Sequence, residues 1–367
     1  MRVFVGTYTE PIRFGTGKIL EGKGEGIYVY RLEPSSGALE LRHIETGVTN
    51  PSYLAFDSTG HFLYAVNELK TYEGRPSGTV SAFKVDPKTA RLQFLNKRLT
   101  HGTDPCHVAV NRKRTHAFVS NFMSGSVCVV PVQDDGSLGP ASDFIQHQGS
   151  SIDPVRQQGP HAHSVTLDRT NHLAFVPDLG LNKLMIYAFD RKRGMLEPHR
   201  VPWIKMRPGA GPRHLALHPG GKFAYLINEL DSTVVALAYD PRRGAFTELQ
   251  TVSTLPGDYQ GESTCAYVQV APSGRFVYAS NRGHDSIVIY EVERTGKLSC
   301  LGHQPTQGKT PRHFQIDPAG TFLLAANQDT DTIVVFRIDP RTGGPVPTGQ
   351  VAHVPTPVCV KFLPSRG

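Results

Sequence analysis

The chain contains 367 residues, 39% of them apolar and 19% charged, which is the composition of a soluble globular protein and excludes a disordered or fibrous one. No segment reaches the roughly 20 apolar residues that span a bilayer, and the opening MRVFVGTYTEPIRF lacks the features of a signal peptide. We therefore expect a cytoplasmic protein without membrane contact. The net charge of +7 is spread along the chain without a basic block or a nucleic-acid-binding motif, which favours a small anionic partner over nucleic acid.

Three short apolar strands are predicted at the start of the chain. They are RVFVGTY (2–8), GIYVYRL (26–32) and LELRHIE (39–45). Each is rich in β-branched and aromatic residues and is bounded by turn-forming residues, as strands are. The first two are joined by a longer connection, residues 10–26, that carries basic residues and glycines.

Six copies of one repeat follow. They are NPSYLAFDSTGHFLYAVNE (50–68), DPCHVAVNRKRTHAFVSNF (104–122), PHAHSVTLDRTNHLAFVPDL (160–179), GPRHLALHPGGKFAYLINE (211–229), STCAYVQVAPSGRFVYASNR (263–282) and TPRHFQIDPAGTFLLAANQ (310–328). Each copy predicts a short first strand, a tight turn and an apolar second strand that ends near an Asn or Asp. A third strand such as STVVALAYD and a weaker fourth such as AFTELQTVS come next. Four strands per unit, recurring at roughly 45 to 55 residues, are typical of a β-propeller blade.

The C-terminal segment completes the ring. TPVCVKFLP (356–364) matches the first strand that the N-terminal unit lacks. Pairing between the two ends would leave no exposed sheet edge at the seam. We therefore predict an all-β fold over residues 1–367: a single seven-bladed β-propeller domain of four-stranded blades, closed by pairing of the C-terminal strand with the N-terminal strands.

Polar residues of the repeat gather at one end of each blade. The start of the first strand and the end of the second lie together because the two strands are antiparallel, and the first strand lines the central channel. The strand interiors are apolar in every copy, whereas the residues at these strand ends differ between copies and are often charged. We therefore interpret the interiors as scaffold and the strand ends as a functional site. The candidate residues at this mouth are His161, His163, Arg213, Glu229, Arg282, His214, Arg312, His313, Glu68 and Gln328. The connections 10–26 and 69–78 are expected to form a rim above it.

The histidines of the mouth have more than one interpretation. His161 and His163 are two residues apart, which places both on the same face of an extended strand. Such a pair also occurs in metal sites, but no ring of acidic residues completes a cage, so we expect neither a metal nor another cofactor. His214 and His313 share a repeat position with His107, and for these three a structural role within the blade is the alternative to substrate binding.

Several motifs together resemble a known family. VGTYT, NPSYLAF, GPHAHSV, GPRHLALHP, LINELDSTV and YASNRGHDSI are similar to those of the lactonase family of seven-bladed propellers. This family includes the propeller-type 6-phosphogluconolactonases and the fungal 3-carboxy-cis,cis-muconate lactonising enzyme. The resemblance covers essentially the whole chain. It implies a metal-independent active site of a histidine, two arginines and a glutamate, which correspond here to His161 or His163, Arg213, Arg282 and Glu229.

The activity that we expect is hydrolysis of a sugar lactone, with 6-phosphogluconolactone of the pentose phosphate pathway as the preferred substrate. Glu229 or one of the paired histidines is the candidate general base, and Arg213 and Arg282 hold the anionic group or the developing oxyanion. The residues expected to bind substrate around them are His214, Arg312, His313, Glu68 and Gln328. The same residues also suit a cycloisomerase acting on 3-carboxy-cis,cis-muconate. A non-catalytic interaction scaffold is the remaining alternative, and the charged mouth disfavours it.

Overall fold

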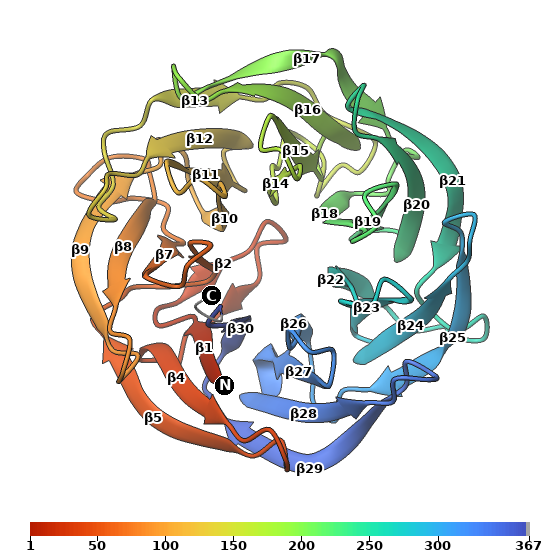
Figure 1. The fold of residues 1–367 in the computed structure, drawn as a ribbon. Coiled ribbons are helices and arrows are strands. Elements are labelled where there is room, and N and C mark those ends of the chain that lie inside the picture. The colour runs from red at the N-terminus through yellow and green to blue at the C-terminus, as the bar shows by residue number, and fades with distance from the viewer. Residues whose placement is uncertain (365–367) are drawn as a thin grey trace.

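Seven four-stranded antiparallel sheets are arranged as blades around one axis (Figure 1). The structure, a computed structural model, describes residues 1–364. The first strands of the seven blades are β30 (Pro357–Phe362), β6 (Leu54–Phe56), β10 (Pro105–Val110), β14 (Thr166–Leu167), β18 (Pro212–Leu217), β22 (Thr264–Val270) and β26 (Pro311–Ile316). The second strands are β1 (Arg2–Thr7), β7 (Phe62–Asn67), β11 (His116–Asn121), β15 (Leu173–Asp178), β19 (Phe223–Asn228), β23 (Phe276–Arg282) and β27 (Phe322–Asn327).

Two further layers complete the blades, which we number 1 to 7 in the order of these lists. The third strands are β4 (Gly26–Leu32), β8 (Thr79–Val85), β12 (Ser126–Pro131), β16 (Lys183–Asp190), β20 (Thr233–Asp240), β24 (Ser286–Val292) and β28 (Thr332–Ile338). The outer strands are β5 (Leu39–Thr46), β9 (Leu92–Leu99), β13 (Asp143–Gln146), β17 (Met195–Lys205), β21 (Ala245–Ser253), β25 (Leu298–Pro305) and β29 (Pro345–His353). The prediction of an all-β, seven-bladed propeller is confirmed.

The two ends of the chain close blade 1. Strand β30 pairs antiparallel with β1, so that Val3 lies opposite Phe362 and Val5 opposite Val360. The predicted pairing of the C-terminal strand with the N-terminal strands is therefore confirmed, and both sides of β1 are hydrogen-bonded.

Each blade packs between two neighbours, which explains why the second strands are apolar runs. Strands β11 and β27 are buried at every residue, whereas the outer strand β5 is largely exposed or half-buried. A strand covered on both faces needs apolar side chains in both directions, so the alternation of polar and apolar residues disappears. The core of the protein therefore consists of layers between blades.

Buried tyrosines connect neighbouring blades. The hydroxyl of Tyr64 in blade 2 donates to the carbonyl of Gly136 in blade 3 at 3.0 Å, and Tyr278 in blade 6 bonds Gly343 in blade 7 at 2.6 Å. Gly136 has φ 85°, and a Cβ there would collide with the ring of Phe62. Glycine is required at this turn because it adopts a positive φ and leaves room for the neighbouring blade.

One small element lies outside the blades near the axis. The hairpin β2 (Ile12–Arg13) and β3 (Ile19–Leu20) belongs to the predicted connection 10–26, and Figure 1 shows it in red, reaching over the middle of the ring. The 3-10 helix η1 (Gln328–Thr330) is the helical segment of residues 1–364. Nothing helical in that part of the chain is long and apolar enough to cross a membrane.

Candidate active site

A repeated irregularity of the first strands aims side chains at one mouth of the ring. In blades 3, 5 and 7 a proline at the start of the strand pairs with the last Asn of the second strand, and the ladder then skips one residue. The skipped residues are Cys106, Arg213 and Arg312. Because proline donates no hydrogen bond and a bulged residue has no partner across the ladder, these side chains leave the regular alternation. All three line the cavity at the mouth.

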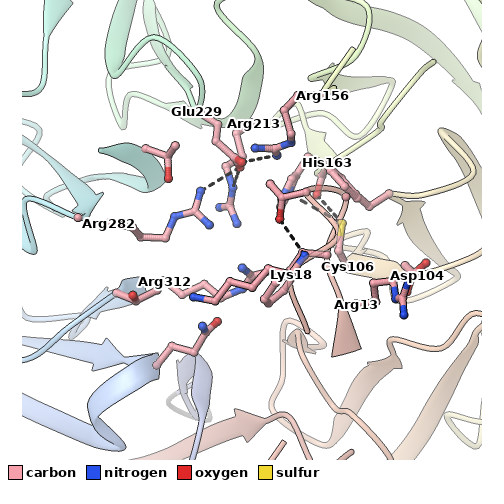
Figure 2. Close-up of a pocket in the computed structure, with 18 of the residues that line it drawn as sticks. Arg13, Lys18, Asp104, Cys106, Arg156, His163, Arg213, Glu229, Arg282 and Arg312 are labelled. Atoms are coloured by element: carbon pink, nitrogen blue, oxygen red, sulfur yellow. Dashed lines mark hydrogen bonds and ion pairs between the residues drawn. The ribbon is translucent and has the colours of Figure 1, made fainter. Parts of the chain in front are cut away.

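This cavity has a volume of about 420 Å³, and Figure 2 shows the charged side chains that surround it. Seven of the ten predicted site residues line it: His163, Arg213, Glu229, Arg282, Arg312, Glu68 and Gln328. Arg13 and Lys18 reach it from the β2–β3 hairpin, so the connection 10–26 forms part of the rim as predicted. No residue of the connection 69–78 lines the cavity, but the carbonyl of Leu69 accepts a hydrogen bond from the backbone of Asp104, which does.

Three arginines bind one carboxylate in the wall of the cavity. Glu229 is 4% exposed, and its oxygens accept hydrogen bonds from Arg156 at 2.6 Å and from Arg213 at 2.8 Å, with Arg282 at 3.1 Å. Burial alone raises the pKa of Glu229, but the charges of Arg282, Arg156 and Arg213 outweigh it and hold the pKa well below its usual range. Glu229 is therefore an ionised, weakly basic group that holds the guanidinium groups in position.

The arginines themselves remain charged. Burial, and then the charge of Arg282, lower the pKa of Arg213 to about 9, so it carries its proton at neutral pH. Arg213 also donates to the carbonyl of Ala266, and Arg282 donates to the carbonyl of Cys265 at 2.8 Å. With these bonds the two guanidinium groups are fixed before any ligand arrives, as electrostatic stabilisation of a developing charge requires.

His163 contributes a neutral imidazole to the same cavity. Its side chain is buried, and burial followed by the charge of Arg213 holds its pKa well below the usual range. Its Nδ1 lies 3.8 Å from Sγ of Cys106, and its ring meets the ring of Phe122 edge-on at 5.3 Å. A neutral histidine has a ring nitrogen free to accept a proton, which suits a general base.

The structure places His161 outside the cavity. Strand β14 comprises only Thr166–Leu167, but an antiparallel bridge joins Ala162 to Asp178. The rings of His161 and His163 both contact Phe122, so the two residues share one face of an extended segment, as predicted. The ring of His161 stacks on Phe122 at 4.7 Å, and its Nδ1 lies 3.0 Å from the carbonyl of Phe122. Of the two histidines left open by the sequence, only His163 meets the space that a substrate can occupy.

His214 and His313 also lie away from the main cavity, contrary to the prediction that they line the mouth. They belong to a buried aromatic cluster, in which the ring of Tyr267 meets that of His214 edge-on at 5.2 Å and lies tilted against that of His313 at 4.1 Å. Nδ1 of His313 accepts a hydrogen bond from the backbone N–H of Val360 at 3.3 Å. Burial keeps the pKa of both histidines well below the usual range. These features agree with the structural alternative.

A second carboxylate faces the cavity through Glu68. Its Oε2 accepts a hydrogen bond from the hydroxyl of Tyr8 at 3.1 Å, and that hydroxyl in turn accepts one from Arg312 at 3.0 Å. Burial raises the pKa of Glu68. Gln328 is also buried, and its amide donates to Asp329 at 2.7 Å while its Oε1 has no hydrogen-bond partner.

Residues 1–364 contain no group of three or more His, Cys, Asp or Glu side chains that could hold a metal ion. The five cysteines are free, and Cys106 is the one that lines the cavity. Burial raises the pKa of Cys106 well above its ordinary value, which keeps it a thiol.

Residues 2–362 match the family described as Lactonase, 7-bladed beta-propeller. The chain belongs to this family. The 6-phosphogluconolactonase of Bacillus subtilis (strain 168) is 37% identical over 361 residues, covering 98% of this chain and 97% of the relative. A Lactococcus lactis subsp. cremoris protein without a named function is 34% identical over 314 residues, 85% of each chain. The solved structure of the periplasmic gluconolactonase PpgL of Pseudomonas aeruginosa has a TM-score of 0.91 at 32% identity and covers 100% of this chain and 99% of that chain.

Several residues of this lactonase-family cavity were not predicted from the sequence. Arg156 comes from the long connection between β13 and β14, which has no counterpart in the repeat, so no register signals it. Asp104 does stand in the repeat, two residues before the bulged Cys106, where the other copies carry different residues. Comparing that position across the copies would have singled out the acidic residue.

Proposed function

We propose that this member of the lactonase family hydrolyses a sugar lactone without a metal ion, and that 6-phosphogluconolactone is its substrate. The observation that carries the proposal is the fixed set of three arginines on Glu229, facing the same cavity as the neutral His163. Such an arrangement supplies both groups that ester hydrolysis needs, a proton acceptor and preorganised cationic donors.

The reaction divides between these residues as follows. His163 accepts a proton from water while the water oxygen bonds to the lactone carbonyl carbon. The carbonyl oxygen becomes an oxyanion, which receives hydrogen bonds from Arg213 and Arg282. The ring C–O bond then breaks, and His163 returns the proton to the departing ring oxygen, so that a carboxylic acid and a hydroxyl result. Glu229 positions the arginines and takes no proton, because its two oxygens are engaged by Arg156, Arg213 and Arg282.

The phosphorylated substrate is supported by charge at the rim and by the relatives. Arg13 and Lys18 are exposed side chains of the β2–β3 hairpin that line the cavity, where they can meet a phosphate that extends out of it. A curated relative is named 6-phosphogluconolactonase. Unphosphorylated gluconolactone is the second candidate, because the similar structure PpgL is named a gluconolactonase.

The test compares initial rates on freshly prepared 6-phosphoglucono-1,5-lactone and glucono-1,5-lactone, above spontaneous hydrolysis and with or without EDTA. Arg213→Lys is the site variant, and Arg207→Lys is its control, because exposed Arg207 pairs with Asp231 away from the cavity. We expect EDTA-insensitive turnover of the phosphorylated lactone that only Arg213→Lys loses. Faster turnover of glucono-1,5-lactone rejects the phosphate preference, loss of activity in EDTA rejects the metal-free reaction, and no turnover of either lactone rejects the proposal.

A further inference from the structure

Asp104 lines the cavity from a backbone that is held on both sides. It is 3% exposed and adopts φ 52°, in the left-handed region. Its N–H donates to the carbonyl of Leu69 at 2.9 Å, and its carbonyl accepts from the N–H of Phe122 at 2.9 Å. With Pro105 following it, the backbone at this point has little freedom, which fixes the direction of the Cα–Cβ bond of Asp104.

The fold needs the backbone conformation at this position but not a carboxylate. The equivalent residues before the strand proline in blades 2, 5 and 7 are Asn50 (φ 40°), Gly211 (φ 69°) and Thr310 (φ 58°). Gly211 has no side chain at all. The Asn50 side chain accepts a bond from the N–H of Thr9 at 2.8 Å, and Thr310 donates to Asp329 at 2.7 Å. At this position the side chain therefore either forms a hydrogen bond within the protein, as in blades 2 and 7, or is missing because the residue is glycine, as in blade 5.

The carboxyl group of Asp104 is different because it bonds to nothing in the described chain. Its Oδ2 is buried and has no hydrogen-bond partner. A buried polar atom without a partner destabilises a protein, so its presence at a cavity needs a reason outside the scaffold. Figure 2 shows Asp104 at one side of the cavity and Arg282 at the other. The cavity thus has a side rich in arginine and a side with an unpaired carboxyl.

Burial, and then the neighbouring Glu68, raise the pKa of Asp104 to about 7, while Lys70 acts in the opposite direction. Near neutral pH the group is present both as a carboxylate and as an acid, so it can accept or donate a hydrogen bond. A sugar hydroxyl can likewise donate or accept a hydrogen bond, so it can pair with either form of Asp104.

We infer that Asp104 binds a hydroxyl group of the substrate and so selects polyhydroxylated lactones, while the arginines bind the charged or reacting end. The inference rests on the proposed function, which it deepens, since it adds a specificity-determining residue on the opposite side of the same cavity. An interaction made equally in the bound substrate and the transition state lowers KM without raising kcat.

The experiment uses Asp104→Gly, because glycine keeps the left-handed backbone as Gly211 does. Asp104→Asn keeps an oxygen acceptor and serves as the conservative variant. Asp258→Gly, which removes an exposed carboxyl from the connection before β22 outside the cavity, is the control. Steady-state kinetics on 6-phosphoglucono-1,5-lactone should show KM raised tenfold to a hundredfold in Asp104→Gly, kcat within threefold of wild type, and an intermediate KM in Asp104→Asn.

A fall in kcat with unchanged KM in both Asp104 variants would overturn the inference in favour of a general acid or base, and unchanged kinetics would overturn it altogether. Thermal unfolding of each variant shows whether it is folded. If the wild type hydrolyses no lactone, the proposed function has failed. Calorimetric titration with gluconate then tests separately whether Asp104 binds a sugar hydroxyl. Binding to wild type and Asp104→Asn but not to Asp104→Gly supports the inference, whereas equal binding by all or no binding to wild type overturns it.

Discussion

Replacing Asp104 with asparagine should stabilise the protein, and more strongly as the pH rises. The pKa of this carboxyl is about 7 in the folded chain, against an ordinary value of 3.8. Below pH 4 or so the group is protonated in both the folded and the unfolded chain. Between the two pKa values the unfolded chain loses the proton first, so the free energy of unfolding falls as the pH rises, and the loss is complete above about pH 7.

The size of the effect follows from the same two values. At 1.36 kcal/mol per pKa unit, the interval from 3.8 to about 7 corresponds to about 4 kcal/mol at pH 8 and to about 1.6 kcal/mol at pH 5. An unfolding entropy of about 2.1 cal/mol/K per residue over 367 residues converts these energies into Tm increases of about 5 °C and about 2 °C. The variant is close in shape to the protonated acid, so little else changes.

The assay is thermal unfolding of wild type and Asp104→Asn at pH 5 and pH 8, with Asp258→Asn as the exposed control. We expect the Tm difference to grow between the two pH values for Asp104→Asn and to stay near zero for the control. Equal Tm values at pH 8, or a difference that does not grow with pH, would refute an ionised carboxyl buried without a partner at this position.

Three further predictions concern other residues that line the cavity. His163→Gln should lower kcat by about 10²-fold or more with KM within a few-fold, measured in steady-state kinetics, because it removes the proton acceptor. Glu229→Gln should destabilise the protein by about 3–5 kcal/mol, measured by denaturant unfolding, because it leaves buried guanidinium groups without their carboxylate; an unchanged midpoint would mean that Glu229 does not hold them. Arg13→Ala combined with Lys18→Ala should raise KM for the phosphorylated lactone about tenfold while Tm and the KM for glucono-1,5-lactone stay the same, since both side chains are exposed; parallel changes for the two lactones would contradict a role in phosphate binding.

The fold could be predicted from the sequence because each blade repeats one pattern of strands and turns. The N-terminal unit lacks a first strand, and this gap predicted that the C-terminal strand β30 supplies it. In the structure β30 does pair with β1. The same register brought Arg213, Glu229 and Arg282 to one mouth, since antiparallel strands place the start of one beside the end of the next. Both results depend on local periodicity, which a sequence displays directly.

The errors come from irregular backbone. Arg213 and His214 are neighbours, but Arg213 is the bulged residue and lines the cavity, whereas His214 returns to the ladder and packs against Tyr53 and Tyr267. His161 shares a face with His163 but does not line the cavity, because its ring is stacked on Phe122. Arg156 lies in a connection that no repeat predicts. Bulges and long connections change the direction of side chains without a period, so a sequence comparison alone does not place them.

The charges of the cavity suggest why two opposite sides are needed. Three guanidinium groups on the single carboxylate of Glu229 leave two positive charges in the wall without an internal partner, and the Nε of Arg282 is buried without a hydrogen bond. Burial, and after it the charge of Arg282, lower the pKa of Arg213, so the guanidinium groups repel one another. An oxyanion that forms there during hydrolysis would relieve this repulsion, but any lactone carbonyl can supply that charge. The unpaired carboxyl of Asp104 adds a second requirement, a hydroxyl on the same molecule, and a sugar lactone meets both.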